Sequence, residues 1–190
     1  MANRFDAIVI GGSAGGMKAL AALLPYFPKD YPLAVIVVLH LHPQQDRYFL
    51  EHFNKLCLLN VKEADEKESI QRGYVYFAPP NYHLLIENDK TFSLSTDEKV
   101  NYCRPSIDVL FESAASAYGP RLAAMLLTGA NNDGAEGLQQ IKEKGGLVIV
   151  QDPQSAESPY MPEAALQLVK PDFVLELAEI GRWLAQSSAK

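Results

Sequence analysis

Residues 7–16 read AIVIGGSAGG, a short apolar run that ends in a glycine-rich turn. An apolar residue at every position is typical of a strand that is buried on both faces, as in a parallel sheet covered by helices. The glycines permit a tight turn into residues 17–26, where apolar residues recur at helical spacing. This stretch therefore predicts the first strand-to-helix step of an α/β fold.

The same alternation continues along most of the chain. Further strands are expected at 34–39, 122–127, 147–150 and 173–175, and further helices at 47–56, 107–117, 132–144, 162–168 and 178–185. The middle differs, because short pieces at 73–77, 83–87 and 91–94 indicate antiparallel structure and the charge-rich 62–69 indicates a solvated loop. We predict one domain over residues 1–190. Its fold is a doubly wound, mostly parallel sheet with helices on both faces (three-layer αβα) and an antiparallel β-hairpin insert.

Composition narrows the class of protein. The 190 residues are 48% hydrophobic and 21% charged, which suits a compact domain and disfavours disorder. A pI near 5.2 without a Lys/Arg cluster disfavours nucleic acid as a partner. The longest apolar runs are too short for membrane insertion, and the N-terminus lacks a signal-peptide pattern, so a cytoplasmic protein is expected. Cys57 and Cys103 match no metal or redox spacing and are interpreted as structural or incidental.

Polar residues follow directly after three of the predicted strands. Ser13 comes after the first, His40 and His42 after the second, and Asp133 after the strand at 122–127. Because the carboxyl ends of parallel strands meet at one edge of a sheet, we expect these side chains to lie close together. A serine, a histidine and an aspartate are the nucleophile, base and orienting group of a hydrolase.

Each of these residues also has an ordinary structural interpretation. Ser13 and Asp133 are residue types that commonly cap helices, and a strand-end histidine is often structural. The amides of the helix after Ser13, however, point to where an oxyanion would develop. Strand alternation places His40 and His42 on the same side, so periodicity does not choose between them.

Two related folds fit less well. A dinucleotide-binding fingerprint needs glycine at position 13, where serine stands, and the lysine of a phosphate-binding loop is missing. Residues 11–15 match G-x-S-x-G of the α/β-hydrolases, but those enzymes order the triad as serine, acid, histidine. Here the order is Ser13, His40, Asp133, so an ordinary α/β-hydrolase is disfavoured.

Several stretches share their residues and their order with one known family: 10–16 (IGGSAGG), 39–41 (LHL), 104–111 (RPSIDVLF), 127–135 (LTGANNDGA), and 151–152 (QD) followed by 161–162 (MP). They resemble the catalytic domain of the bacterial chemotaxis protein-glutamate methylesterase, CheB. The resemblance implies hydrolysis of γ-glutamyl methyl esters on the cytoplasmic helices of chemoreceptors, with release of methanol. It also implies deamidation of particular receptor glutamines, and no metal or organic cofactor.

The resemblance assigns the triad to Ser13, His40 and Asp133, with His42 as a neighbour. Smaller roles are expected at four other residues. Arg104 would pair with an acidic receptor surface, or alternatively with Asp108. Met161 would line the ester pocket, or alternatively serve ordinary packing. The backbone amides of Ala14 and Ala130 are candidates for the oxyanion hole by their position.

The chain departs from the family pattern in two places. Ala130-Asn131 stands where family members commonly have Met-Gly, and the first strand begins close to Met1, where the usual member carries a receiver domain first. We therefore expect either an excised domain or a free-standing enzyme, whose substrate could then be another methylated protein. Two alternative functions stay open: a non-catalytic module that docks on receptors or signalling partners, and a small-molecule esterase that uses the same triad.

Overall fold

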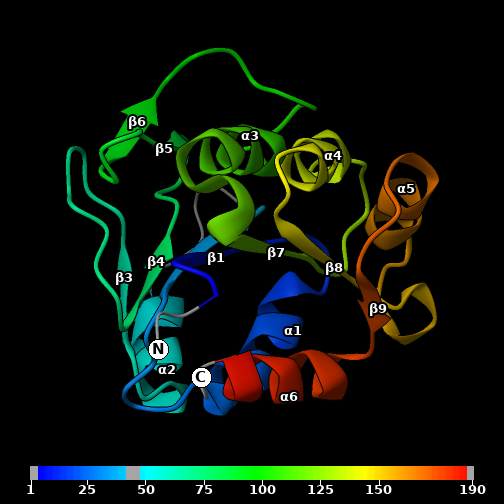
Figure 1. The fold of residues 1–190 in the computed structure, drawn as a ribbon, viewed down its shortest axis with the longest axis horizontal. Helices are drawn as coiled ribbons and strands as arrows, with labels where there is room; N and C mark the ends of the chain where they lie inside the picture. The colour runs from blue at the N-terminus through cyan, green and yellow to red at the C-terminus, as the bar shows by residue number, and fades with distance from the viewer. Residues whose placement is uncertain (1–3, 42–47, 188–190) are drawn as a thin grey trace.

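The computed structural model describes residues 4–41 and 48–187. Its centre is a seven-stranded sheet in the order β3-β4-β2-β1-β7-β8-β9, and all of its paired strands run parallel (Figure 1). The strands are β1 (Ala7–Gly12), β2 (Ala34–Leu39), β3 (Asn60–Glu63), β4 (Tyr74–Phe77), β7 (Leu122–Leu126), β8 (Leu147–Gln151) and β9 (Phe173–Leu175). An antiparallel hairpin of β5 (His83–Ile86) and β6 (Phe92–Ser95) lies outside this sheet.

Helices cover both faces of the sheet. They are α1 (Gly16–Leu23), α2 (Tyr48–Leu56), α3 (Ile107–Tyr118), α4 (Ala135–Glu143), α5 (Tyr160–Leu168) and α6 (Leu177–Ser187). Figure 1 shows α1, α2 and α6 on one side and α3, α4 and α5 on the other. Three 3₁₀ turns complete the described elements, at Leu24–Tyr26, Gly119–Arg121 and Pro153–Ser155. The predicted three-layer αβα fold with a hairpin insert is confirmed.

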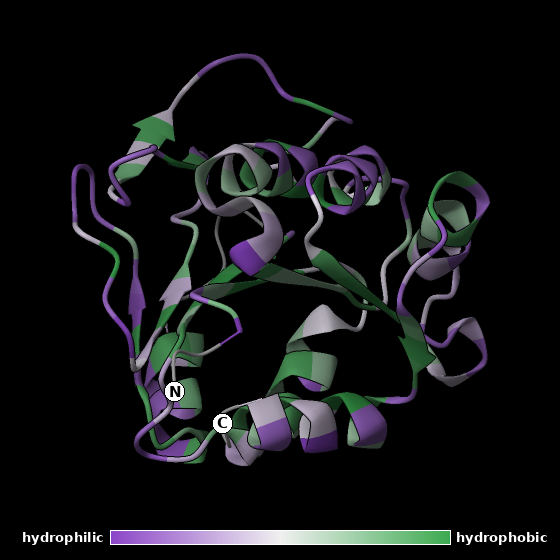
Figure 2. Ribbon diagram, in the orientation of Figure 1, coloured by the Kyte–Doolittle hydropathy of each residue, from purple (hydrophilic) through white to green (hydrophobic). Residues whose placement is uncertain are grey.

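The period of two along each strand divides the core into two layers. On β1, Ile8 and Ile10 pack with α1 and α6, whereas Ala7 and Val9 pack with α3 and α4. Hydrophobic colour marks β8 and β9, the edge strand β3 is hydrophilic, and hydrophilic colour also gathers on the outer turns of α3 and α4 (Figure 2). Among the described residues, none of the helices has the length and hydrophobicity needed to cross a lipid bilayer.

Two local predictions were wrong. Residues 73–77 were expected to be antiparallel, but β4 pairs parallel with both β2 and β3. A short apolar run shows that a strand is buried, not in which direction it runs. The charge-rich 62–69 was expected to be a loop throughout, but Lys62 and Glu63 belong to the edge strand β3. An edge strand tolerates charge, and Lys62 Nζ reaches Asp65 and Glu68 at 3.0 and 2.8 Å.

The strand order reverses at the middle of the sheet. From β1 the chain adds β2, β4 and β3 on one side, and β7, β8 and β9 on the other. In open α/β sheets, ligands bind beyond the carboxyl ends of the strands at such a switch point. The loops that follow β1, β2 and β7 meet there, and they carry Ser13, His40 and Asp133 respectively.

Candidate active site

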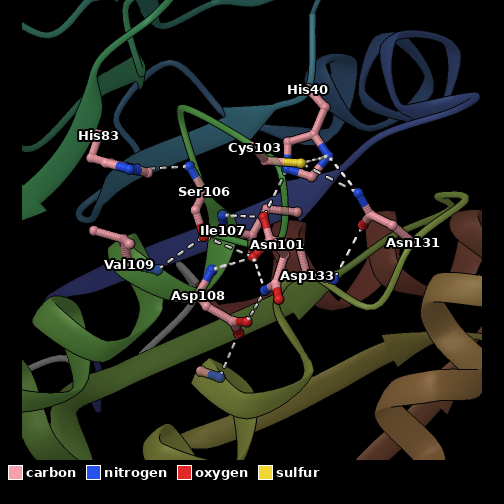
Figure 3. A network of polar contacts seen from close by, with 11 residues as sticks. His40, His83, Asn101, Cys103, Ser106, Ile107, Asp108, Val109, Asn131 and Asp133 are labelled. Atoms are coloured by element: carbon pink, nitrogen blue, oxygen red, sulfur yellow. Dashed lines mark hydrogen bonds and ion pairs between the residues drawn. The ribbon is translucent and has the colours of Figure 1, made fainter. Parts of the chain in front are cut away.

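A histidine–aspartate pair lies at the switch point. His40 follows β2, Asp133 follows β7, and His40 Nε2 lies 2.8 Å from Asp133 Oδ2 (Figure 3). The Asp133 side chain is fully buried, and that of His40 is only 12% exposed. The sequence prediction placed these two residues at one edge from distant parts of the chain, and the structure brings them into direct contact.

The Asp133 carboxylate is surrounded by hydrogen-bond donors. Besides His40 Nε2, it accepts bonds from Asn101 Nδ2 (3.1 Å), Ser106 Oγ (2.8 Å), Ile107 N (2.6 Å) and Asp108 N (3.1 Å). Burial alone would raise the pKa of this carboxyl group, but the bonds from His40, Ile107, Asn101 and Ser106 outweigh burial and lower the pKa below its usual value. Asp133 is therefore held as an anion.

Two of those donors are the first backbone amides of α3. A negative charge at a helix N-terminus is stabilised by the exposed N–H groups and by the helix dipole. Ser106 is the N-cap of α3, as predicted, and its hydroxyl oxygen accepts a bond from Val109 N while it donates to Asp133. Asp133 was also considered as a cap of α4, but that helix has Gly134 as its N-cap and no side-chain cap. The interpretation of Asp133 as a cap of α4 was thus wrong, because Asp133 accepts bonds from the first amides of α3.

The bond to Asp133 fixes the proton arrangement on His40. Because an ionised carboxylate can only accept, Nε2 carries the hydrogen of the neutral ring and Nδ1 carries the lone pair. Burial disfavours the protonated ring, but the hydrogen bonds and charge from Asp133 and Cys103 outweigh it and raise the pKa of His40 to about 9. Nδ1 is thus the atom that takes up a proton, and the protonated ring gives that proton up only at high pH.

Ser13 lies beside this pair in the backbone register. The Ser13 N–H donates to Thr128 O at 2.9 Å, and the His40 N–H donates to Gly12 O at 3.1 Å, so β1 delivers Ser13 between the ends of β2 and β7. The structure shows no hydrogen bond between the Ser13 hydroxyl and the His40 ring, both within the described part of the chain. Ser13 is not a helix cap either, because α1 has Gly15 as its N-cap and no side-chain cap. His42 lies outside the described residues.

His40 Nδ1 instead faces Cys103 and Asn131. Cys103 Sγ lies 3.6 Å away and Asn131 Nδ2 lies 3.4 Å away (Figure 3). Sequence reasoning interpreted Cys103 as structural or incidental and did not place Asn131 near the histidine. The one available signal was position, since Cys103 directly precedes the RPSIDVLF stretch that also supplies Ser106.

The two candidate oxyanion amides lie on loops that Thr128 holds in place. Ala14 and Ala130 are both exposed, and among the described contacts neither backbone N–H has a protein acceptor. Thr128 ties their loops together, because its hydroxyl donates to Ala14 O at 2.9 Å and accepts from Ser158 N at 2.8 Å. Amides without a protein acceptor are one requirement of an oxyanion hole, and the assignment of Ala14 and Ala130 stays a prediction.

Met161 and Arg104 occupy different surroundings. Met161 is fully buried and packs directly against Gly129, where an added Cβ would lie 2.6 Å from the Met161 sulfur. Arg104 lines a cavity of about 360 Å³ together with His40 and Cys103. Its guanidinium donates to Asn81 Oδ1 (2.9 Å) and to the carbonyls of Thr96 (2.8 Å) and Asp97 (2.9 Å).

The alternative partner of Arg104 is engaged elsewhere. Asp108 accepts from Asn101 Nδ2 at 2.8 Å and from Gly137 N at 2.7 Å, so the interpretation of Arg104 as its ion-pair partner was wrong. Burial and the neighbouring Asp133 charge raise the pKa of Asp108 to about 6, while the bonds from Gly137 and Asn101 oppose that shift. The contacts of Arg104 and Met161 with substrate stay predictions.

A metal ion is a poor fit to this cluster. His40, Cys103 and Asp133 offer potential ligand atoms within 4.8 Å of one another. However, Asp133 already accepts bonds from two backbone amides, two side-chain donors and the His40 ring, so a cation there would face N–H groups instead of free lone pairs. The hydrogen-bond donors around Asp133 suit a carboxylate that orients the His40 ring.

A histidine–aspartate pair at the switch point of a parallel α/β sheet is an arrangement that hydrolases use. The profile of the CheB methylesterase family matches residues 8–184, so the chain belongs to the CheB methylesterase family. Its fold matches the crystal structure of the Thermotoga maritima CheB methylesterase catalytic domain with a TM-score of 0.91 and 32% identity, covering 96% of this chain and 98% of that one.

Curated relatives agree with this assignment. A Leptospira interrogans relative named among the protein-glutamate methylesterases/protein-glutamine glutaminases is 51% identical over 176 residues, which are 93% of this chain and 91% of the relative. Protein-glutamate methylesterase/protein-glutamine glutaminase 2 of Methanosarcina mazei is 38% identical over 179 residues, covering 90% of this chain and 49% of that protein. The expectation of a carboxylic ester hydrolase of the chemotaxis methylesterase family is confirmed.

Replacing Asp133 by alanine should destabilise the fold. The Ile107 and Asp108 amides and the Ser106 hydroxyl would lose their buried acceptor, at a cost of about 2–4 kcal/mol. Urea unfolding measures this difference. Glu136→Ala, at an exposed position in the first turn of α4, is the matched control and should change the unfolding free energy by less than about 0.5 kcal/mol. Equal stability of Asp133→Ala and the wild type would contradict the anchoring role.

The raised pKa of His40 should make stability depend on pH. The folded protein holds the His40 proton up to about pH 9, whereas the unfolded chain holds it only to about pH 6.5. The contribution of the protonated His40–Asp133 pair to the unfolding free energy is therefore complete below pH 6.5 and is lost as the pH rises through 9. The unfolding free energy of the wild type should therefore fall relative to that of His40→Gln between these values. Urea titrations at several pH values test this, and parallel curves for the two proteins would refute it.

Proposed function

We propose that this protein hydrolyses γ-glutamyl methyl esters on cytoplasmic helices of chemoreceptors, giving glutamate and methanol, with Ser13 as nucleophile. The observation that carries the proposal is the bond between His40 Nε2 and Asp133. It leaves Nδ1 as the ring's proton acceptor at the edge where β1 delivers Ser13. Family membership supplies the substrate class.

In the acylation step, the Ser13 hydroxyl proton passes to His40 Nδ1 as Oγ attacks the ester carbonyl. The negative charge that develops on the carbonyl oxygen is stabilised by the amides of Ala14 and Ala130. His40 then gives its proton to the departing methoxide, which leaves as methanol. Hydrogen bonds of this kind are often long or absent in unliganded enzymes and tighten only when substrate binds, so the lack of a Ser13–His40 bond does not oppose the step.

Deacylation repeats the same chemistry with water. His40 Nδ1 takes a proton from water, hydroxide attacks the acyl-enzyme, and the proton returns to Ser13 Oγ as glutamate leaves. Asp133 keeps the imidazole in one tautomer and stabilises its charged form throughout. No metal or organic cofactor takes part in this scheme.

The substrate would approach over the cavity beside His40. Lys99 and Arg104 both line this cavity and place positive charge at the site. A receptor helix rich in glutamate would be attracted there, and methylation would remove charge from the glutamate that enters. We propose cytoplasmic receptor segments as the partner on this basis, and the cytoplasm as the location.

Deamidation of receptor glutamines is a second activity of the same site. The names of the relatives pair methylesterase with protein-glutamine glutaminase. A γ-carboxamide differs from the methyl ester only in its leaving group, and protonation by His40 would release it as ammonia. The alternatives of a non-catalytic docking module and a small-molecule esterase differ in whether turnover occurs and whether a receptor helix is preferred.

Methanol release from a methylated receptor cytoplasmic fragment tests the proposal. The wild type should release methanol, and Ser13→Ala should lower the rate by at least about 10³-fold because the nucleophile is absent. Ser116→Ala, at an exposed position on α3, is the matched serine control and should keep the wild-type rate. Retained activity in Ser13→Ala would reject Ser13 as nucleophile.

Two further outcomes separate the alternatives. A wild type that labels with a fluorophosphonate at Ser13, dependent on His40, but hydrolyses small esters with no preference for the receptor fragment would favour a small-molecule esterase. A wild type with neither labelling nor turnover would favour a docking module.

The pH dependence of kcat/KM should follow the titration of His40. Only the neutral ring accepts the Ser13 proton, so kcat/KM should rise with pH up to about 9, and Asp133→Asn should shift this rise to lower pH. Methanol release corrected for the Ser13→Ala background, which accounts for spontaneous ester hydrolysis, gives the profile. A plateau already reached at pH 7 would contradict the raised pKa of His40.

A further inference from the structure

A thiol occupies the position that a nucleophile needs at the His40 base. Cys103 Sγ lies 3.6 Å from Nδ1, and the ring's other nitrogen is bonded to Asp133. Thiol, imidazole and carboxylate are thus aligned in the sequence of nucleophile, base and orienting group. His40 is consequently placed to accept a proton from Cys103.

Asn131 adds a donor to the same sulfur. Its Oδ1 accepts a bond from Asp133 N at 3.1 Å, which directs its amide NH₂ toward the histidine and the cysteine. Asn131 Nδ2 lies 3.4 Å from Cys103 Sγ and 3.4 Å from His40 Nδ1. The sulfur is therefore in contact with both the imidazole and an amide N–H donor.

The sulfur is also reachable from solvent. Cys103 is partly exposed and lines the cavity of about 360 Å³, whose other lining residues include Lys99, Tyr102 and Arg104. The two cations favour small ligands that carry carboxylates. Cys57, by contrast, is buried in the core, and burial raises the pKa of its thiol.

We propose that Cys103 is a modification site, a thiol activated by His40 and Asn131 that forms a mixed disulfide with small carboxylate-bearing disulfides. In molecules whose His40 ring is neutral, the Cys103 proton passes to His40 Nδ1, and the thiolate attacks one sulfur of the reagent. A new disulfide bond forms to Sγ as the reagent's own S–S bond breaks. The Cys103 sulfur is oxidised, the departing sulfur is reduced, and the departing thiolate takes up the proton.

Modification would close the active site. The attached group would occupy the cavity next to His40 Nδ1, the atom that must accept the Ser13 proton. This consequence rests on the proposed esterase function, whereas the reactivity of Cys103 does not.

Labelling with 5,5′-dithiobis(2-nitrobenzoate), an aromatic disulfide with two carboxylates, tests the reactivity. With the native wild type, reaction at Cys103 should release the reagent's thiolate in a fast phase, while Cys57 reacts only after unfolding. Peptide mass spectrometry identifies the modified cysteine. His40→Gln should slow the fast phase about tenfold, and Asn131→Ala should slow it severalfold. Ser116→Ala is the control for unrelated changes and should keep the wild-type rate.

The two variants make the labelling test decisive. Circular dichroism checks that each is folded, and Asn131→Ala still decides the question if His40→Gln is not. A native Cys103 that reacts no faster than it does in the folded variants, or that does not react, overturns the proposal.

The activity arm uses methanol release after labelling. Labelled wild type should lose its activity and regain it with dithiothreitol, whereas Cys103→Ala should keep its own untreated rate after the same treatment. Fully labelled wild type that still releases methanol overturns the blocking consequence. An untreated wild type that releases none contradicts the proposed function alone, since the labelling rates still decide the modification site.

Discussion

The buried carboxylate of Asp133 at the start of α3 is the interaction on which the rest of the site depends. A buried charge is costly unless hydrogen bonds replace its lost hydration, and here the His40 ring, two side chains and two helix amides do so. The same group therefore joins the loop after β7, the N-terminus of α3 and the histidine after β2. The parts of the site cannot shift independently without leaving one of these donors unsatisfied.

Packing around Ile107 reinforces that junction. An added Cβ on Gly11 would lie 2.4 Å from the Ile107 side chain, and one on Gly134, where φ is +98°, would lie 2.8 Å from it. Only glycine fits at either place. The first residue of α3 is thus held between the end of β1 and the turn after Asp133. Hydrogen bonds and close packing consequently fix the same point from two sides.

The anchoring of His40 has a chemical cost. The Asp133 carboxylate that orients the ring also stabilises its protonated form, and the nearby Cys103 thiol adds to this effect. A base whose pKa is well above neutral is mostly protonated at pH 7, so much of the enzyme waits in a form that cannot accept a proton. Tight positioning and proton affinity thus oppose each other in this pair.

Sequence patterns predicted most of the fold because burial leaves a direct trace in residue order. The strand over 34–39 and the strand over 173–175 have the predicted limits, since apolar runs bounded by turn residues define them. The direction of β4 left no such trace, because it depends on which neighbour the strand joins. The helix that Asp133 caps was misassigned for the same reason: the correct one begins 26 residues earlier in the chain.

The site shows the same division. Placing polar residues after parallel strands was enough to bring His40 and Asp133 to one edge. The contact of Cys103 with His40 was not foreseeable, because it joins residues 63 positions apart through a loop with no periodic pattern. Asn131 could be recognised only as a departure from the family, not as a donor to that sulfur.

The loop after β7 separates a fixed base from a variable tip. Thr128 and Gly129 are bound by Gln151, Ser158 and Met161, and Asp133 is buried at the other end. Ala130 and Asn132 between these anchors are exposed. Changes at positions 130 and 132 should therefore leave the scaffold intact, whereas Asn131 accepts a bond from Asp133 N. Directed libraries aimed at new ester substrates would best be confined to positions 130 and 132.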